Sequence, residues 1–422
     1  MSNAFPRMIR VRQEFPKSPP LDIRSTICNE FQRFQRQIKP GMQIAVAIGS
    51  RGIANLPEIV SGVLESLKAF GARPFILPAM GSHGGATSEG QIGILASLGI
   101  SEAGMNVCVR PSMEVKQIGT LPAGAPVYCS VEALNADGIV LINRIKPHTD
   151  FSGSLGSGIV KMSVVGLGKH AGAAAMHVAA TRLGHEQVIR SMAGVVIRTA
   201  PVLCGVAILE NQFHETAKLA VLPREEIESG ENQLFSESRT LMPTLPFDEI
   251  DLLIVERIGK NISGAGMDPN VTGRWVDGYL TSLARNNRPA PFIRRIFVRD
   301  LTQETHGNAI GIGLADATTS RVVRAMDRES MRVNALTALT PNSVKIPMVF
   351  DNDRDAVEAM LRSLAVADTR AVWLVRISDT SSLAELEVSE ALLSEVQARS
   401  NLRATSELRE LEFGPSGNLT AL

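Results

Sequence analysis

Two histidines of this chain each directly follow an apolar segment. His83 lies in the run Gly81-Ser82-His83-Gly84-Gly85, and His148 lies in Lys146-Pro147-His148-Thr149. An imidazole binds and releases a proton near neutral pH, so two of them on opposite sides of a small substrate can act as base and acid at a stereocentre. The alternative for either residue is an ordinary loop histidine in contact with water.

A lysine and a third histidine follow. Lys161 comes after the glycine-serine loop 152–158, whose N–H groups could bind phosphate or carboxylate, and it has apolar neighbours. Burial would favour its uncharged, nucleophilic amine; alternatively, its stem lies along an apolar surface with the charged end in water. His177 lies in the alanine-rich segment 172–183. Imidazole binds nickel, copper, zinc or iron, although one histidine without neighbouring ligands is a weak metal motif.

Two glycine-containing segments are further candidates for binding loops. Residues 166–171 match the dinucleotide fingerprint G-x-G-x-x-A, but Glu186, at the distance of the acidic residue that such a site needs, lies in a helical pattern. We therefore interpret this match as coincidental. The loop 259–270 follows an apolar run, and Lys260 in it could pair with an anionic group of a cofactor or substrate. Its glycines could equally serve only a tight turn.

The elements that must position these residues alternate between strands and helices. Apolar runs predict strands at 43–49, 73–80 and 136–145, and helical spacing of apolar residues predicts helices at 57–70, 91–98 and 172–183. This alternation indicates a mainly parallel sheet that is covered on both faces. In such sheets ligands bind beyond the carboxyl ends of the strands, where His83 and His148 are expected.

The length of 422 residues exceeds what one hydrophobic core usually supports. We predict two α/β domains with mainly parallel sheets and an active site in the cleft between them. The polar stretch 223–248 is interpreted as the linker, so that residues 1–245 form the first domain and 246–422 the second. In the second domain the patterns predict strands at 250–256, 295–298 and 371–375 and helices at 355–364 and 383–398.

The composition excludes several classes of protein. Basic and acidic residues both number 43, without a long run of one sign, which argues against a nucleic-acid partner. The four cysteines show no C-x-x-C spacing and are expected to be buried small residues in a reducing cytoplasm. Because no apolar segment is long enough to span a membrane or follows Met1 as a signal peptide would, we expect neither membrane insertion nor secretion.

Taken together, these motifs resemble the nickel-pincer lactate racemase family over nearly the whole chain. The resemblance rests on five stretches in a fixed order: 81–84, 143–149, 157–161, His177 and the loop 258–273. It implies two α/β domains and a nickel-pincer nucleotide, a pyridinium mononucleotide whose two sulfur-bearing arms grip nickel together with a carbon.

The resemblance also implies roles for individual residues. His83 and His148 match the acid/base pair, Lys161 the lysine tethered to the cofactor, and His177 the nickel ligand. Further cofactor contacts are predicted at Arg51, Ser82, Gly84, Lys260 and Asn261. The implied reaction is hydride transfer from the α-carbon of a 2-hydroxy acid, coupled to loss of its hydroxyl proton, followed by hydride return to the other face.

Arg51 resembles an arginine of an anion-binding motif of the family, but the acidic residue usual there is missing from Ile48-Gly49-Ser50-Arg51. The loop between His148 and Lys161 is also longer than in the lactate enzymes. We therefore predict a racemase or epimerase of a small 2-hydroxy acid without specifying lactate. The alternatives are an NAD(P)-dependent oxidoreductase that uses residues 166–171 and a non-catalytic binding protein for the nickel nucleotide. The sequence does not indicate a subunit number.

Overall fold

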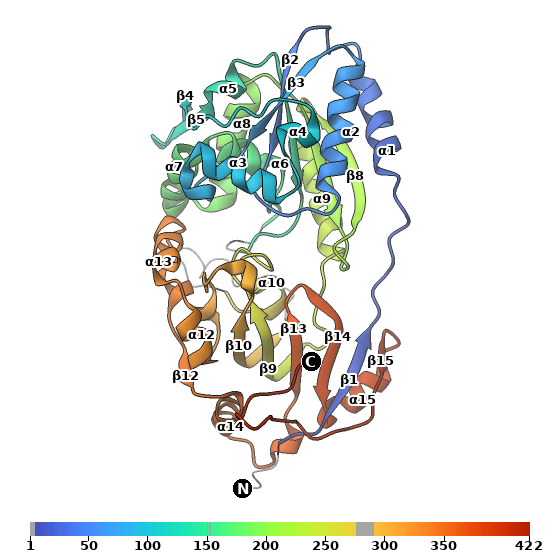
Figure 1. Cartoon of the computed structure of the whole chain (residues 1–422), viewed down its shortest axis with the longest axis vertical. Helices are drawn as coiled ribbons and strands as arrows, with labels where there is room; N and C mark the ends of the chain where they lie inside the picture. Colours follow the sequence, from blue (N-terminus) through green and yellow to red (C-terminus); the bar gives the residue numbers. More distant parts are fainter. Residues whose placement is uncertain (1–4, 150, 152, 276–290) are drawn as a thin grey trace. The chain divides into compact units, whose positions relative to one another are not determined.

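The computed structural model describes residues 5–149, 151, 153–275 and 291–422. The chain divides into two compact units (Figure 1). The middle unit comprises Ser18–Met242, and the terminal unit comprises Met1–Lys17 together with Pro243–Leu422. Each unit contains its own sheet with helices, which confirms the α/β class expected from the sequence.

The middle unit contains a five-stranded sheet in the order β3-β2-β6-β7-β8. The first four strands are parallel and β8 is the antiparallel edge. Val46 on β2 lies opposite Ile76 on β3 and Val140 on β6, which fixes the register. The strands are β2 (Gln43–Ile48), β3 (Arg73–Pro78), β6 (Gly138–Arg144), β7 (Val202–Glu210) and β8 (Thr216–Pro223), and a separate antiparallel hairpin consists of β4 (Val115–Thr120) and β5 (Pro126–Ser130).

Helices cover both faces of this sheet, as the uninterrupted apolar strands predict. Alternate residues of β2 enter two different cores: Val46 packs with α1 and α2, and Ala47 packs with α7, α8 and α9. The helices of the unit are α1 (Ile23–Phe31), α2 (Leu56–Ala69), α3 (Ser88–Ser97), α4 (Glu102–Met105), α5 (Val131–Leu134), α6 (Ile159–Lys161), α7 (Lys169–Leu183), α8 (His185–Thr199) and α9 (Ile227–Thr240). Short helical turns are η1 (Gln32–Phe34), η2 (His83–Ala86), η4 (Arg224–Glu226) and the π-helical segment η3 (Met162–Gly166).

The terminal unit contains an eight-stranded mixed sheet in the order β12-β11-β10-β9-β13-β14-β1-β15. The strands from β12 to β13 are parallel, whereas β14, β1 and β15 continue the sheet in antiparallel fashion. The strands are β1 (Met8–Gln13), β9 (Glu249–Ile258), β10 (Phe292–Leu301), β11 (Ala317–Thr319), β12 (Met348–Phe350), β13 (Leu374–Asp379), β14 (Ser382–Ser389) and β15 (Leu402–Ala404). Helical elements of this unit are α10 (Pro269–Thr272), α12 (Ser320–Ala325), α13 (Arg328–Thr337), α14 (Asp353–Ser363), α15 (Leu393–Ala398), η6 (Gln303–Thr305), η7 (Ile312–Leu314), η8 (Pro341–Val344), η9 (Thr369–Ala371) and η10 (Glu390–Leu392).

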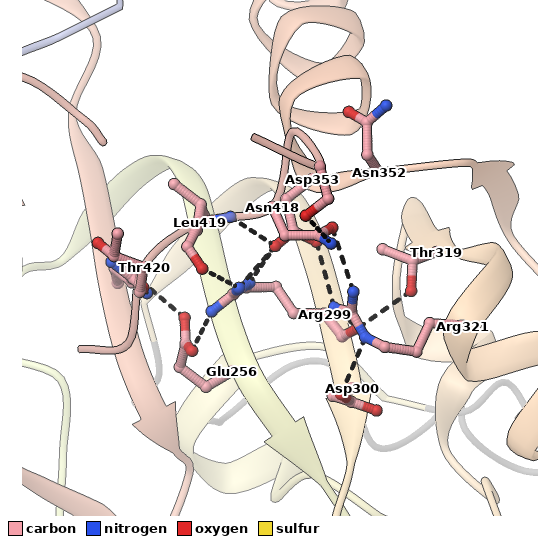
Figure 2. A network of polar contacts seen from close by, with 12 residues as sticks. Glu256, Arg299, Asp300, Thr319, Arg321, Asn352, Asp353, Asn418, Leu419 and Thr420 are labelled. Carbon is pink, nitrogen blue, oxygen red and sulfur yellow. Dashed lines mark hydrogen bonds and ion pairs between the residues drawn. The ribbon is translucent and has the colours of Figure 1, made fainter. Parts of the chain in front are cut away.

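A buried network of charged side chains ties the C-terminal segment to this sheet (Figure 2). Asp353, which is fully buried at the start of α14, accepts hydrogen bonds from Arg299 Nε at 2.8 Å and Nη2 at 2.6 Å. It also accepts one from the backbone N–H of Leu419 at 2.9 Å. Arg299 pairs in addition with Glu256, and Arg376 pairs with Glu256 at 2.7 Å. The C-terminal segment is therefore held by hydrogen bonds between the Leu419 backbone and this ion-paired network, as well as by apolar packing.

Three expectations from the sequence need correction. Residues 1–17 do not belong to the first domain, because β1 pairs with β14 and β15 of the terminal unit. The polar stretch 223–248 is not a plain linker, because α9 lies within it and packs on the middle-unit sheet through Ile227, Leu234 and Phe235. The segment 383–398 begins as strand β14 and becomes helical only at its end, because β1 and β13 pair with it on both sides.

The cysteines differ from expectation in part. Cys129 and Cys204 are buried, as expected, whereas Cys28 and Cys108 are exposed, and all four are free thiols. Among the described residues, no helix combines the length and the apolar character that a membrane span requires.

Candidate functional site

The loops that carry the predicted site residues leave one edge of the middle-unit sheet. Strands β3, β2 and β6 are neighbours in that order and run parallel. Their carboxyl ends lie close to one another, because Ile48, the last residue of β2, is opposite Pro78, the last residue of β3, and Ile142, two residues before the end of β6. The segments after the three strands, which contain His83, Ser50-Arg51 and His148, therefore start side by side at the carboxyl edge, where α/β sheets bind ligands.

His83 begins the short turn η2, five residues after the last residue of β3. Its Nδ1 is hydrogen-bonded to the side chain of Ser50, which follows β2. Gly84 in this turn has φ +65°, and a side chain there would overlap the backbone of Gly90, so only glycine fits. The predicted cofactor-binding residues Ser82 and Gly84 thus belong to the turn that presents His83.

A buried lysine, Lys169, supports the loop that leads from β3 to this turn. The Lys169 amine is fully buried and donates hydrogen bonds to the carbonyl of Pro78, at the end of β3, and to Gln91 Oε1 at 3.3 Å. The Gln91 amide donates to the carbonyls of Met80 at 3.2 Å and Gly81 at 3.4 Å. Burial lowers the pKa of Lys169 to about 8. In the segment 166–171, whose match to a dinucleotide fingerprint we interpret as coincidental, Lys169 thus supports the loop after β3, and Gly168 packs closely against the carbonyl of Val164.

His148 lies at the centre of a group of cationic and aromatic side chains. Its Nε2 is hydrogen-bonded to the amine of Lys161, which brings two predicted site residues into contact. Burial holds the pKa of His148 well below its usual range, and the nearby charges of Lys161, His185, His177 and Arg51 lower it further. His148 is consequently neutral at physiological pH and can accept a proton.

Aromatic stacking connects His148 to two histidines around α7 and α8. Phe151 lies between two imidazoles: its ring centroid is 4.4 Å from that of His148 and 5.1 Å from that of His185, with nearly parallel planes. The His185 ring in turn meets His177 edge-on at 6.1 Å. His148, Lys161, His177 and Arg51 are thus gathered in one region.

Lys161 is positioned by a short helix whose start is anchored to the sheet. It is the last residue of α6 and is partly buried. The Asn143 amide, near the end of β6, donates a hydrogen bond to the carbonyl of Gly158, the residue before α6, at 2.9 Å. At the next strand, Glu210 pairs with Arg144 and accepts a hydrogen bond from the backbone N–H of Ala54 at 2.6 Å, which fixes the segment that carries Arg51.

Sequence reasoning missed Ser50, Phe151 and His185 as members of this region. His185 is at the start of α8, eight residues after His177, and no helical spacing relates the two because Gly184 separates α7 from α8. Phe151 follows His148 by three residues in a loop without regular structure. A signal was available in the composition, because Phe151 is an isolated aromatic residue between two histidine-bearing segments of an aromatic-poor chain.

Lys260 and Asn261 belong to the terminal unit, in the loop after β9. The Lys260 amine donates to Asn334 Oδ1 on α13, and Asn261 Oδ1 accepts from the Thr302 hydroxyl at 2.6 Å. Their predicted contacts with a cofactor remain predictions.

The donor set limits how a metal could be held. Among the residues that the structure describes, no three or more His, Cys, Asp or Glu side chains are grouped so as to bind a metal ion. A metal at His177 would therefore need most of its ligands from a bound organic group, since sites built from protein alone usually have three or four ligands. An imidazole in the same region as the Lys161 amine, as that of His177 is, fits a metal that arrives already chelated.

Comparisons with known proteins agree with the fold and with the first half of the chain. Residues 23–188 match the family described as lactate racemase N-terminal domain. The structure is similar to that of the lactate racemase apoprotein from Thermoanaerobacterium thermosaccharolyticum, with a TM-score of 0.53 and 15% sequence identity over 89% of this chain and 99% of that chain. No curated protein matches the sequence. The matched region includes His83, His148, Lys161 and His177.

Proposed function

We propose that this chain, whose residues 23–188 match the lactate racemase N-terminal domain and whose fold is similar to that of a lactate racemase apoprotein, interconverts the stereoisomers of a small 2-hydroxy acid. The observation that carries the proposal is the contact between His148 and Lys161 within reach of the charges of His177 and Arg51. A neutral base, an anchoring amine, a metal-binding imidazole and a guanidinium for a carboxylate are the groups that this reaction requires.

The residues of the site suit a nickel-pincer nucleotide. Lys161 would tether the nucleotide and His177 would complete the nickel coordination. The chemistry supplied by the group when bound is reversible acceptance of a hydride from the substrate α-carbon, which avoids removing a barely acidic α-proton.

The protein side chains would bind the substrate and move its hydroxyl proton. Arg51, which is exposed, would bind the substrate carboxylate through a charge-assisted hydrogen bond. His148, neutral because of its lowered pKa, would accept the hydroxyl proton as the α-carbon loses hydride and the substrate becomes a 2-oxo acid. His83, whose Nδ1 is hydrogen-bonded to Ser50, would return a proton when hydride comes back to the opposite face. In the reverse direction the two imidazoles exchange roles.

The fate of the α-hydrogen tests this mechanism. The protein, produced together with enzymes that make the cofactor, is incubated in D₂O with single enantiomers from a panel of 2-hydroxy acids, and optical rotation and α-deuterium content are measured. Loss of rotation with retention of the α-hydrogen is expected, because hydride does not exchange with solvent. Incorporation of solvent deuterium at the rate of racemisation would instead establish deprotonation of the α-carbon, and inertness towards the whole panel would refute the proposed substrate class.

Single variants test the assigned roles. His83→Ala and His148→Ala are each expected to lower turnover by about 10²–10⁴-fold, the usual contribution of a general acid or base. His177→Ala is expected to abolish nickel retention, measured by elemental analysis of the purified protein. His170→Ala is the matched control, because His170 is exposed on the same helix. Equal nickel content in the His177 and His170 variants would contradict the metal assignment.

A further inference from the structure

The start of α6, which ends at Lys161, rests on a buried carboxyl group from a distant helix. Glu231 on α9 is fully buried, and its Oε2 accepts a hydrogen bond from the backbone N–H of Val160 at 2.9 Å. The first N–H groups of a helix have no partner within the helix. Glu231 therefore satisfies one of them from 71 residues away in the sequence.

The backbone before α6 packs closely against the Glu231 carboxyl group. A side chain on Gly158 would overlap the Glu231 carboxyl group and would have to displace it, so the absence of a side chain at the residue before α6 leaves room for this carboxyl group. The carbonyl of the same glycine accepts the hydrogen bond from Asn143. The backbone of 158–160 is thus held from the sheet on one side and from α9 on the other, one residue before Lys161.

We propose that Glu231 is a positioning residue, which fixes the first turn of α6 and thereby holds the Lys161 amine against His148. The role follows from the contacts: Glu231 bonds Val160, Val160 precedes Lys161, and Lys161 bonds His148. Without the Glu231 carboxyl group, the Val160 N–H in the first turn of the three-residue helix α6 would lose this hydrogen bond, and the segment would lose its tie to α9 at that point. The consequence of Glu231 for catalysis rests on the proposed role of Lys161. The hydrogen bond between Glu231 and Val160 does not depend on that role.

The burial of the Glu231 carboxyl group agrees with its role as a positioning residue. It raises the pKa of Glu231 to about 7, against the opposing effect of the N–H groups of Val160 and Ile159. In either protonation state one carboxyl oxygen can accept the Val160 N–H. The reach of the side chain, rather than its charge, should therefore determine where Lys161 lies.

Two conservative substitutions separate reach from charge. Glu231→Gln keeps the length and the accepting oxygen but removes the charge. Glu231→Asp keeps the charge but withdraws the carboxyl group from Val160 by one carbon. The readouts are the acylation rate of Lys161 in the protein without cofactor, measured by mass spectrometry of its peptide, and the ring ¹⁵N chemical shifts of His148, measured by NMR.

Glu231→Asp is expected to change the Lys161 acylation rate by roughly tenfold, about the equilibrium effect of losing one hydrogen bond. It should also shift the His148 resonances, because the contact between the imidazole and the amine is lost. Glu231→Gln should stay within about twofold of the unmodified protein. Leu234→Ala, which loosens the packing of α9 through another buried residue, is the matched control and should leave both readouts unchanged.

Three results would overturn the inference. The first is that Glu231→Asp leaves both the Lys161 acylation rate and the His148 chemical shifts unchanged. The others are that Glu231→Gln changes them as strongly as Glu231→Asp does, or that Leu234→Ala changes them to the same extent. Since neither readout requires turnover, failure of the proposed racemase activity would leave this test intact. Conversely, a racemase whose Lys161 is insensitive to Glu231 would retain the proposed function and lose only this inference.

Discussion

Removal of the Asp353 carboxylate should strongly destabilise the terminal unit. Asp353 is fully buried and accepts four hydrogen bonds: two from Arg299, one from Arg321 at 3.3 Å and one from the Leu419 N–H. Asp353→Ala leaves the nearly buried Arg299 with Glu256 and the Leu419 carbonyl as partners. Breaking a buried ion pair from one side costs about 3–5 kcal/mol. The unfolding equilibrium constant should therefore rise by roughly two to four powers of ten, since 1.4 kcal/mol corresponds to a factor of ten.

Urea unfolding followed by tryptophan fluorescence measures this loss selectively. The chain has two tryptophans, Trp275 and Trp373, and both belong to the terminal unit. The matched control is Glu329→Gln, which removes an ion pair with Arg332 in which both side chains are about two-thirds exposed. Exposed pairs contribute about 0–1 kcal/mol. A loss below about 1 kcal/mol in the Asp353 variant, or losses of equal size in both variants, would refute the argument from burial.

The same segment gives a second readout for Asp353→Ala. Asp353 and Arg299 hold the backbone of Leu419 (Figure 2). Limited proteolysis should therefore remove the C-terminal residues from the Asp353 variant faster than from the Glu329 variant. Equal cleavage rates would show that apolar packing, for example of Leu411 and Leu419, holds this segment without the ion pairs.

Two further predictions concern buried groups with opposite dependence of stability on pH, measured by far-ultraviolet circular dichroism in urea. Burial raises the pKa of Glu231 from 4.5 to about 7, so the folded state binds more protons and stability should fall by up to about 3 kcal/mol as pH rises across this window. Glu231→Gln should abolish that fall, and an unchanged slope would exclude Glu231 as its source. For Lys169, the pKa is lowered from 10.5 to about 8, so the unfolded state binds more protons and stability should rise by up to about 3 kcal/mol between these values. Lys169→Met should remove this rise; persistence of the rise would contradict the assignment to Lys169.

The parallel sheet of the middle unit could be predicted from the sequence because its strands are buried on both faces. Residues such as those of β2 form an uninterrupted apolar run that is typical of such strands. The placement of His83 and His148 after strands followed from the same runs. The secondary structure of residues 383–398 was harder to predict, because their apolar residues fit both helical and strand spacing. Only the pairing with β1 and β13 makes the start of this segment a strand.

The parts that the sequence could not predict depend on contacts between distant residues. Glu231 lies in a polar stretch whose composition resembles a linker, yet the fold buries it against the amide of Val160. Phe151 and His185 join the candidate site only because an irregular loop folds back onto the start of α8. Such contacts carry no local periodicity, and a single sequence gives no other record of them.

The position of β1 also has a consequence for biosynthesis. This strand precedes the whole middle unit in the chain, whereas its partners β14 and β15 follow that unit and are separated from β1 by about 370 residues or more. At translation rates of roughly 5–20 residues per second, β1 must wait about 20–75 s for a partner, time in which the middle unit can fold. An unpaired apolar strand invites aggregation, but Arg10 and Arg12 alternate with the buried residues of β1, and such charges oppose pairing with other chains. Replacement of these two arginines should therefore reduce soluble yield during rapid expression more than it reduces the stability of the folded protein.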